Sequence, residues 1–247
     1  MKVVAVIPAR YQSTRFEGKP LADIHGKPMI YHVYDRAKRA VGIQDVFVAT
    51  DDERIRKAVE DFGGKVVMTS PEHKTGTDRI AEAASDLDVD IVINVQGDEP
   101  LVHPEMLEQA MQPLLEEPKL LVTTLISPIE DAADFIASTI VKTVVDPKRN
   151  VLFFSRSPIP YPKTRQSYIA YKQVGLYAFR KEFLLEFAAM APTPLELIEG
   201  VELLRAVENG IQVRGVETRH RTISVDTISD LFEVRKVLKP EKAFIQP

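Results

Sequence analysis

The sequence predicts an α/β protein with a mainly parallel β-sheet covered by helices. Two observations lead to this prediction. Short runs rich in β-branched residues alternate with segments of helical periodicity, and polar loops follow three of these runs. Ligands of such sheets bind beyond the carboxyl ends of the strands. The loops after Ile7, Ala49 and Val95 are therefore where we expect the chemistry.

The first hundred residues contain four expected strands and two expected helices. One helix carries Ile55, Val59 and Phe62 at helical spacing and ends at the two glycines that follow. The other carries Ile80 and Ala84 in the same pattern. Both apolar stripes are expected to face the core. The strands are expected at residues 3–7, 46–49, 66–68 and 91–95.

From about Leu121 the pattern changes, and residues 121–180 are expected to form an insert with a small antiparallel sheet. No segment has the composition of a flexible linker, so we treat residues 1–247 as a single domain against which the insert packs. The expected elements are strands at 122–126, 140–145 and 151–154, helices at 181–189 and 195–208, a strand at 211–216 and a last helix from about residue 229.

Composition and charge exclude several classes of protein. Hydrophobic residues make up 45% and charged residues 28% of the chain, which is typical of a soluble globular protein. The net charge of −4 provides no overall positive field to hold nucleic acid or an anionic membrane, and no apolar run predicts a transmembrane helix. The absence of cysteine excludes disulfides and thiolate metal sites and suits a cytoplasmic location.

The loop after the first strand has the composition of a polyphosphate cradle. Residues 8–20 carry three cations, Arg10, Arg15 and Lys19, with three hydroxyl groups and a glycine. Such groups could bind phosphate oxygens and neutralise the charge that develops on departing pyrophosphate. A solvated basic loop is the alternative, but the position at a strand end favours the cradle. The loop is not a P-loop, because proline follows its Gly-Lys pair, and no G-x-G-x-x-G motif supports a dinucleotide oxidoreductase.

Two aspartates at strand ends could hold Mg²⁺. Asp98 follows the most apolar strand, and Asp226 precedes the last expected helix. Magnesium is usually held by one or two carboxylates together with substrate phosphates. The alternatives are a turn stabilised by Asp98 and helix capping by Asp226. With the cationic loop, the two carboxylates favour metal-assisted phosphoryl or nucleotidyl transfer. The five histidines show no metal-ligand spacing.

The segment from Thr75 to Arg79 opens the second expected helix. Gly76 and two threonines at a helix N-terminus would suit contacts to a base or a ribose. Thr77 could instead be the N-cap of that helix, which would need no ligand.

Ordered blocks of residues from one end of the chain to the other point to a known family. The first loop contains Ile7-Pro8-Ala9-Arg10-Tyr11, Ser13-Thr14-Arg15 and Gly18-Lys19-Pro20-Leu21. Later blocks are Gly26-Lys27-Pro28-Met29-Ile30, Val48-Ala49-Thr50-Asp51, Gly76-Thr77-Asp78-Arg79, Asn94-Val95-Gln96-Gly97-Asp98-Glu99-Pro100, Phe154-Ser155-Arg156, Gly175-Leu176-Tyr177, Pro194-Leu195-Glu196 and Val225-Asp226-Thr227. Together they closely resemble the 3-deoxy-D-manno-octulosonate (Kdo) cytidylyltransferases, also called CMP-Kdo synthetases.

This resemblance implies a nucleotidyltransferase fold, a Rossmann-like three-layer sandwich with a mixed central sheet and a smaller inserted sheet used for dimerisation. It also implies that CTP reacts with an acidic 2-keto-3-deoxy sugar, Kdo, to give CMP-Kdo and pyrophosphate for lipopolysaccharide biosynthesis. Mg²⁺ is the implied cofactor, a homodimer the implied assembly and the cytoplasm the implied location.

The resemblance also implies roles for single residues. CTP would be held by Ala9, Arg10, Ser13, Arg15, Lys19, Gly76, Thr77 and Arg79, and Mg²⁺ by Asp98 and Asp226. Catalysis would depend on Arg10, Lys19, Asp98 and Asp226, and the sugar would face Gln96, Arg156, Gln173, Tyr177 and Glu202. The Arg156 guanidinium could bind the sugar carboxylate through two parallel hydrogen bonds, and a surface ion pair is its alternative role.

Two positions of the expected sugar pocket depart from the family pattern. Gln173 stands where histidine is usual, and Leu203 stands where glutamine is usual. An unpaired substrate hydroxyl beside Leu203 would cost roughly 1 to 3 kcal/mol. The same chemistry on amino-Kdo or on a nonulosonic acid is therefore an alternative. A non-catalytic nucleotide-binding regulator is an alternative of another class, but it predicts the loss of a metal carboxylate or a phosphate-binding cation, and none is lost.

Overall fold

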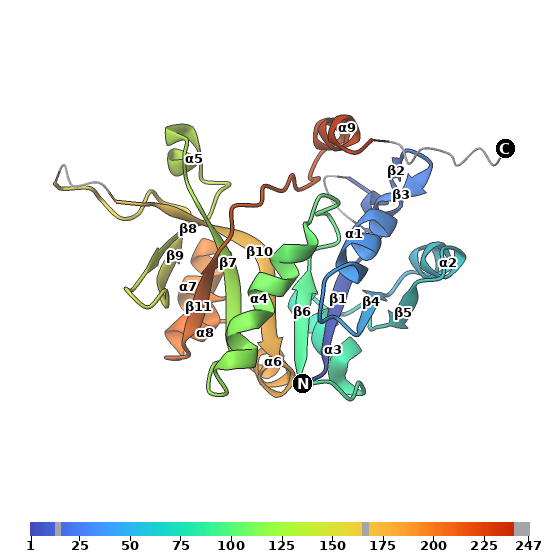
Figure 1. Ribbon diagram of the computed structural model, residues 1–247, viewed down its shortest axis with the longest axis horizontal. Coiled ribbons are helices and arrows are strands. Elements are labelled where there is room, and N and C mark those ends of the chain that lie inside the picture. Colours follow the sequence, from blue (N-terminus) through green and yellow to red (C-terminus); the bar gives the residue numbers. More distant parts are fainter. Residues whose placement is uncertain (13–15, 165–167, 240–247) are drawn as a thin grey trace.

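A computed structural model describes residues 1–12, 16–164 and 168–239 (Figure 1). Its centre is a nine-stranded mixed sheet in which seven strands follow the order β11-β7-β10-β6-β1-β4-β5. Four strands of this order are parallel: β6 (Ile91–Val95), β1 (Val3–Ala9), β4 (Asp45–Thr50) and β5 (Lys65–Met68). These confirm the four strands expected in the first hundred residues. Their near-continuous apolar sequences suit strands that are covered on both faces.

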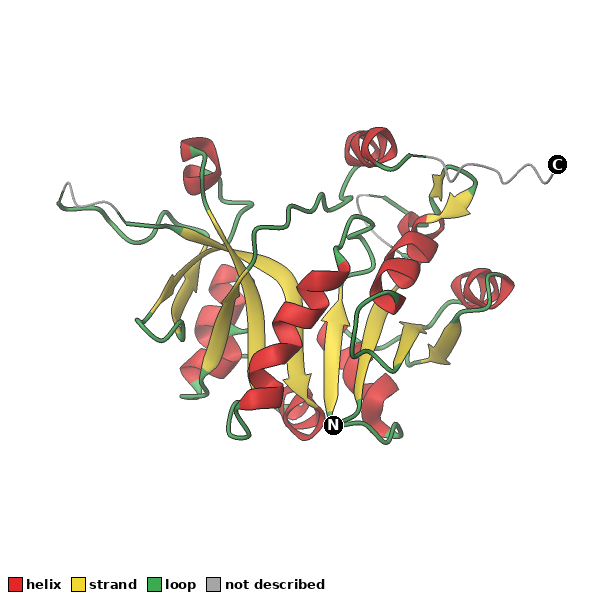
Figure 2. Cartoon of the chain, in the orientation of Figure 1, coloured by secondary structure: helices red, strands yellow, loops and turns green. Residues whose placement is uncertain are grey.

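Helices cover both faces of the sheet and complete a three-layer sandwich (Figure 2). One core lies between the sheet and helices α1 (Met29–Lys38), α2 (Glu53–Asp61) and α4 (Pro104–Glu116). A second core lies on the other face, beneath α3 (Gly76–Ser85), α6 (Lys181–Ala189) and α8 (Leu204–Glu208). Ile55 and Val59 of α2 and Ile80 and Ala84 of α3 are fully buried, which confirms the predicted apolar stripes.

The segment 121–180 is antiparallel, as expected, but it does not form a separate sheet. Strands β7 (Val122–Pro128) and β10 (Tyr171–Arg180) belong to the central sheet, where β10 pairs with both β6 and β7. Strands β8 (Lys142–Val145) and β9 (Val151–Ser155) form a hairpin that branches from the start of β10. The ten residues of β10 are long enough to serve both groups of strands. Helix α5 (Ala132–Ile136) lies between β7 and β8, and β2 (Asp23–Ile24) and β3 (Lys27–Pro28) form a small sheet of their own.

The single helix expected over 195–208 is wrong, because two short helices occupy this segment. Helix α7 (Pro194–Glu199) ends at Gly200, whose φ of 61° lies in the left-handed region that favours glycine, and α8 begins at Leu204. Strand β11 (Val213–Glu217) follows α8 and pairs in parallel with β7.

A long irregular segment, residues 218–227, connects β11 to the last helix, α9 (Ile228–Val237). We call it the strap. Figure 1 shows it crossing from β11 to the far side of the molecule along the edge where β1 and β6 end. The strap brings Asp226 to the carboxyl ends of the parallel strands. Among the described residues, no helix is both long and apolar enough to span a bilayer.

Candidate active site

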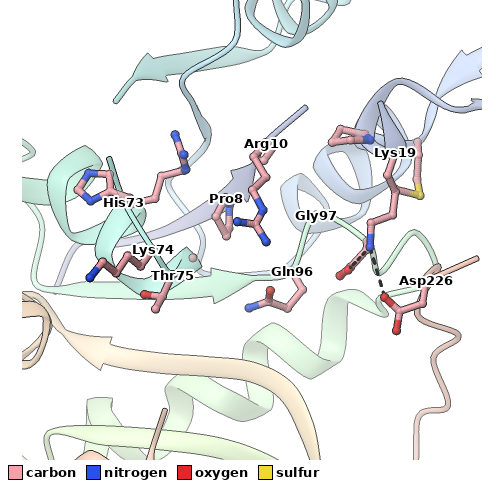
Figure 3. A pocket seen from close by; sticks show the side chains of 15 residues that line it. Pro8, Arg10, Lys19, His73, Lys74, Thr75, Gln96, Gly97 and Asp226 are labelled. Carbon is pink, nitrogen blue, oxygen red and sulfur yellow. Dashed lines mark hydrogen bonds and ion pairs between the residues drawn. The ribbon is translucent and has the colours of Figure 1, made fainter. Parts of the chain in front are cut away.

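A cavity of about 260 Å³ opens at the carboxyl ends of β1 and β6 (Figure 3). Its wall combines the end of β1, the short 3-10 turn η1 (Lys19–Leu21), the start of α3, the turn after β6 and the end of the strap. The lining residues include the predicted Ala9, Arg10, Lys19, Gly76, Arg79, Gln96, Asp98 and Asp226. The structure therefore gathers both predicted catalytic cations and both predicted metal carboxylates around one cavity.

Lys19 lies between the two aspartates. Its Nζ is 2.7 Å from Asp98 Oδ2 and 3.5 Å from Asp226 Oδ1. The backbone holds the two carboxylates together as well, because the N–H of Val225 donates to the carbonyl of Asp98 at 2.9 Å. Helix capping does not explain Asp226, since the Thr227 side chain caps α9. Asp98 lies in a turn, which agrees with the alternative role of stabilising a turn, but it also lines the cavity.

Gly97 allows the ends of β1 and β6 to approach closely. A Cβ atom at this position would lie 2.8 Å from the carbonyl oxygen of Pro8, which is closer than non-bonded carbon and oxygen atoms come. Only glycine fits here without a shift of backbone. The turn that carries Asp98 is thereby held against the strand that leads to Arg10.

The cationic loop is folded back on itself by Tyr11. The N–H of Gly18 donates to the Tyr11 carbonyl at 2.9 Å, and the Arg54 guanidinium stacks 3.3 Å from the centre of the Tyr11 ring. In Figure 3, Arg10 and Lys19 reach into the cavity from this loop. The predicted nucleotide-binding residues Ser13 and Arg15 lie outside the described residues.

The start of α3 forms another side of the cavity. Thr75 caps the helix, because its side chain accepts the N–H of Asp78 at 3.1 Å, so the capping role considered for Thr77 is wrong. Thr77 is buried and does not line this cavity. The Arg79 guanidinium does line it, but it is already engaged, donating to Thr69 Oγ1 at 2.6 Å and pairing with Asp51 at 3.0 Å.

A second cavity, of about 280 Å³, adjoins the first and shares Gly76 and Gln96 with it. Its wall comes from β10, the end of β9, the start of β8 and the segment after α7. All five residues predicted to face the sugar line this second cavity: Gln96, Arg156, Gln173, Tyr177 and Glu202. Their separation in the sequence means that only the fold brings them together.

Glu202 and Tyr177 give the second cavity hydrogen-bonding groups whose ionisation is suppressed. Burial raises the pKa of the Glu202 carboxyl. The pKa of the Tyr177 hydroxyl is also raised, mainly by burial and to a smaller extent by the nearby carboxylate of Glu202. Thr77 Oγ1 donates to Glu202 Oε2 at 2.7 Å, whereas Glu202 Oε1 is buried without a hydrogen-bond partner. An unpaired polar atom beside a cavity is suited to receive a ligand hydroxyl.

Arg156 supplies a positive charge to the wall of the second cavity. Its guanidinium donates to the carbonyls of Glu199 at 2.7 Å, Ser138 at 3.0 Å and Gly200 at 3.4 Å. A guanidinium has five N–H groups, so donors remain after these three bonds. Carbonyls rather than a carboxylate hold the side chain, and within the described residues Arg156 does not form the surface ion pair considered as an alternative.

Leu203 is wrongly predicted to belong to the sugar pocket. Only 1% of its surface is exposed, it packs in the core beneath α8, and it does not line the second cavity. Leu203 directly precedes α8 and packs with the buried residues of that helix, whereas its neighbour Glu202 lines the cavity. Gln173 is thus the one departure from the family pattern that reaches the cavity.

Several residues of the site were not singled out from the sequence. His73 and Lys74 line the first cavity, and their place between β5 and α3, at the carboxyl edge of the sheet, is the signal that could have found them. Glu99 follows Asp98, and its Oε2 is buried without a partner. Burial, reinforced by the charge of Asp98, raises the pKa of Glu99 to about 7.

Outside these cavities, His103, Glu105 and His220 come together at the surface. Each offers a ligand atom within 4.8 Å of the others, although 117 positions of sequence separate the two histidines. The imidazole rings stack with their centres 4.1 Å apart and their planes 6° from parallel. Lone pairs in two stacked planes do not converge on one point, so we assign no metal to this cluster.

A mixed sheet with a cationic loop, two carboxylates at the strand ends and an adjoining polar cavity defines a nucleotidyltransferase. The sequence model of the family described as cytidylyltransferase matches residues 4–218. Two bacterial proteins named 3-deoxy-manno-octulosonate cytidylyltransferase are close relatives. The one from Geobacter sulfurreducens is 51% identical over 97% of this chain and 100% of its own length, and the one from Pelobacter propionicus is 52% identical over 96% and 97%.

A solved structure extends the agreement to three dimensions. A CMP:2-keto-3-deoxy-manno-octonic acid synthetase complexed with CTP matches with a TM-score of 0.92 and 44% identity, over 96% of this chain and 98% of that one. The chain belongs to the cytidylyltransferases, and within them to the 3-deoxy-manno-octulosonate cytidylyltransferase family. This confirms the family resemblance found in the sequence.

Proposed function

We propose that the protein transfers a cytidylyl group from CTP to Kdo, giving CMP-Kdo and pyrophosphate. One observation carries the proposal: a cavity lined by four cationic side chains and two carboxylates adjoins a second cavity lined by Arg156 and polar hydrogen-bonding groups. A polyphosphate fits the first and a sugar acid fits the second. The relatives' names and the CTP complex of the related synthetase support the same reaction.

In the first cavity, Arg10 and Lys19 bind the triphosphate. Their charges offset the negative charge that develops on the α-phosphate and on the departing pyrophosphate. The anomeric hydroxyl of the sugar attacks the α-phosphorus in line, and no covalent enzyme intermediate is needed. Gln96 and Gly76, which line both cavities, lie where the two substrates meet.

Asp98 and Asp226 fit a Mg²⁺ ion. Two carboxylates at the rim of a phosphate-sized cavity are the ligands that Mg²⁺ takes together with substrate phosphates. Both carboxylates lie beside the ammonium of Lys19, which indicates that together they can bind a positive charge. A bound Mg²⁺ would stabilise charge on the phosphate oxygens and help to orient the triphosphate.

In the second cavity, Arg156 binds the sugar carboxylate, and the side chains around it bind the hydroxyls. Gln96, Gln173 and Tyr177 can donate or accept hydrogen bonds, and the unpaired oxygen of Glu202 accepts one. Amino-Kdo or a nonulosonic acid remains a second candidate for the acceptor, and it now rests on Gln173 alone.

Pyrophosphate release tests this function. Purified protein is incubated with Mg²⁺, each nucleoside triphosphate in turn and a panel of 2-keto-3-deoxy sugar acids. We expect release with CTP and Kdo and little with the other nucleotides. If CTP releases no pyrophosphate with any acid in the panel, the proposed reaction is incorrect. Faster release with an amino-Kdo than with Kdo would move the assignment to the second candidate.

We also propose a homodimer in the cytoplasm that serves lipopolysaccharide biosynthesis. Exposed apolar side chains around the β8–β9 hairpin support the dimer: Leu152 is 58% and Ile136 is 70% exposed. The use of CTP and the absence of cysteine support the location. Sedimentation of the wild type and of Leu152→Glu tests the assembly. A wild type that sediments as a monomer at micromolar concentration would contradict it.

A further inference from the structure

Lys142 is a fully buried lysine at the start of β8. Its ammonium donates to three backbone carbonyls, those of Ala137 at 2.8 Å, Ile140 at 2.7 Å and Arg156 at 2.6 Å. These bonds use all the N–H groups of the ammonium. In the described part of the chain, no carboxylate forms an ion pair with it.

A buried ammonium held only by carbonyls is unusual. Charged side chains are rarely buried without a partner of opposite charge, because the loss of hydration is costly. An apolar side chain of similar length would avoid that cost. Burial, followed by the charge of Arg156, lowers the pKa of Lys142, which reflects the same strain on the charged form. The cost of burying this cation is therefore expected to be offset by the structure that the ammonium holds in place.

The ammonium lies directly behind the wall of the second cavity. Two lining residues adjoin it: Val141 precedes Lys142 in the chain, and the Arg156 carbonyl accepts a hydrogen bond from its ammonium. Lys142 donates to the carbonyls of Ala137 and Ile140, which lie in one turn. The carbonyl of Ser138, in the same turn, accepts a hydrogen bond from the Arg156 guanidinium. Lys142 thus holds both the backbone of Arg156 and the turn that orients its side chain.

The charge balance of this wall favours an anionic ligand. Arg156 and Lys142 are two cations, and Glu199 is the carboxylate that acts on the charge of Lys142. Glu202 also lines this cavity, and burial raises the pKa of its carboxyl group. Glu199 is already bound, since its oxygens accept from Ser155 Oγ at 2.7 Å and from the Arg156 N–H at 2.9 Å. An anion in the cavity would relieve the repulsion between the two cations.

We propose that Lys142 is a positioning residue for the acceptor substrate, whose buried ammonium fixes the Arg156 turn and strengthens the binding of the sugar carboxylate. This inference rests on the proposed function, because it concerns the acid that the second cavity receives. It adds a residue that never touches the substrate and acts through Arg156.

Steady-state kinetics of two variants test the proposal. Lys142→Met removes the charge and the hydrogen bonds, whereas Lys142→Gln removes the charge and keeps donors for the carbonyls. We expect both to raise the KM for Kdo at least about tenfold and to leave the KM for CTP within about twofold. Lys172→Met is the matched control: this lysine lies in the adjacent strand β10, pairs with Asp134 at 2.8 Å and does not line the cavity, so both KM values should stay near those of the wild type.

Each outcome decides the matter. A Kdo KM of Lys142→Gln within twofold of the wild type would overturn the proposal, because the charge would then be dispensable. An equal rise in the KM for CTP would also overturn it, since general loosening of the fold would explain both changes. If Lys142→Met does not fold, Lys142→Gln alone decides. Failure of the proposed function shows itself differently, as a wild type that turns over no sugar acid.

Discussion

The ammonium of Lys19 lies 2.7 Å from the carboxylate of Asp98, although 79 positions of sequence separate the two residues. One follows the first strand and the other follows β6, its direct neighbour in the sheet. Their contact joins the proposed phosphate-binding loop to the proposed metal site. A change at either residue therefore acts on both functions of the first cavity.

Asp98→Asn should abolish turnover while the protein stays folded. The amide keeps the shape of the side chain but loses the charge that would hold Mg²⁺, and a metal ion supplies several kcal/mol of charge stabilisation in such reactions. We expect kcat to fall by about a thousandfold or more. Asp88→Asn, at an exposed aspartate that pairs with Lys2, is the control and should keep full activity. An active Asp98→Asn enzyme would remove Asp98 from the metal site.

Gly97→Ala should damage the site through the backbone. The new methyl group would meet the Pro8 carbonyl oxygen at 2.8 Å, so either β1 or the Asp98 turn must move. We expect a loss of about 1 to 3 kcal/mol of unfolding free energy, as is typical of overpacking, with a larger fall in kcat. In Gly175→Ala the nearest atom, Gln96 Cγ, would be 3.5 Å away, an ordinary contact. Chemical denaturation and turnover are measured for both variants. If Gly97→Ala and Gly175→Ala lose the same stability and activity, the close approach of Gly97 to Pro8 does not limit this position.

The strands around the first cavity could be predicted from the sequence because each is a continuous apolar run that ends in a polar loop. Strand β10 could not be predicted in this way. Gly175 interrupts its pattern, and its register shifts between Val174 and Tyr177. The second cavity depends on that strand, so its position was beyond any argument from periodicity.

Similar limits apply to single side chains. Thr75 and Thr77 are both plausible N-caps by composition, and the choice depends on where the chain turns into α3. Adjacent residues can also face different environments, as Glu202 and Leu203 do. The family resemblance placed Arg156, Gln173 and Glu202 in one pocket, and the three residues do line one cavity, but the resemblance could not tell which of their neighbours are core residues.

Glu99 should make stability depend on pH. Its pKa is raised from 4.5 to about 7, so the folded protein holds this proton more tightly than the unfolded chain does. The resulting stabilisation is fully present below pH 4.5 and is lost as the pH rises to about 7; in total it is on the order of 3 kcal/mol. Glu99→Gln should remove this loss.

Urea denaturation at pH 5 and pH 8, with EDTA to exclude metal ions, measures the effect. We expect Glu99→Gln to be more stable than the wild type at pH 8 and to differ little from it at pH 5. Glu116→Gln, at an exposed position of α4, is the control and should leave the pH dependence unchanged. A wild type and a Glu99→Gln variant with parallel pH profiles would show that Glu99 ionises normally.

The identity of the sugar should depend on Gln173 and not on Leu203. Leu203→Gln would bury an amide in an apolar core, so we expect it to lower the unfolding free energy by about 2 to 4 kcal/mol. In protein that remains folded, the KM for Kdo should change little, because the side chain does not line the cavity. Gln173→His changes a lining residue whose Nε2 lies 3.5 Å from the Tyr177 hydroxyl. It should leave stability within about 0.5 kcal/mol and shift the ratio of kcat/KM between Kdo and amino-Kdo. A change of sugar preference in Leu203→Gln, with none in Gln173→His, would show that the core position controls the pocket after all.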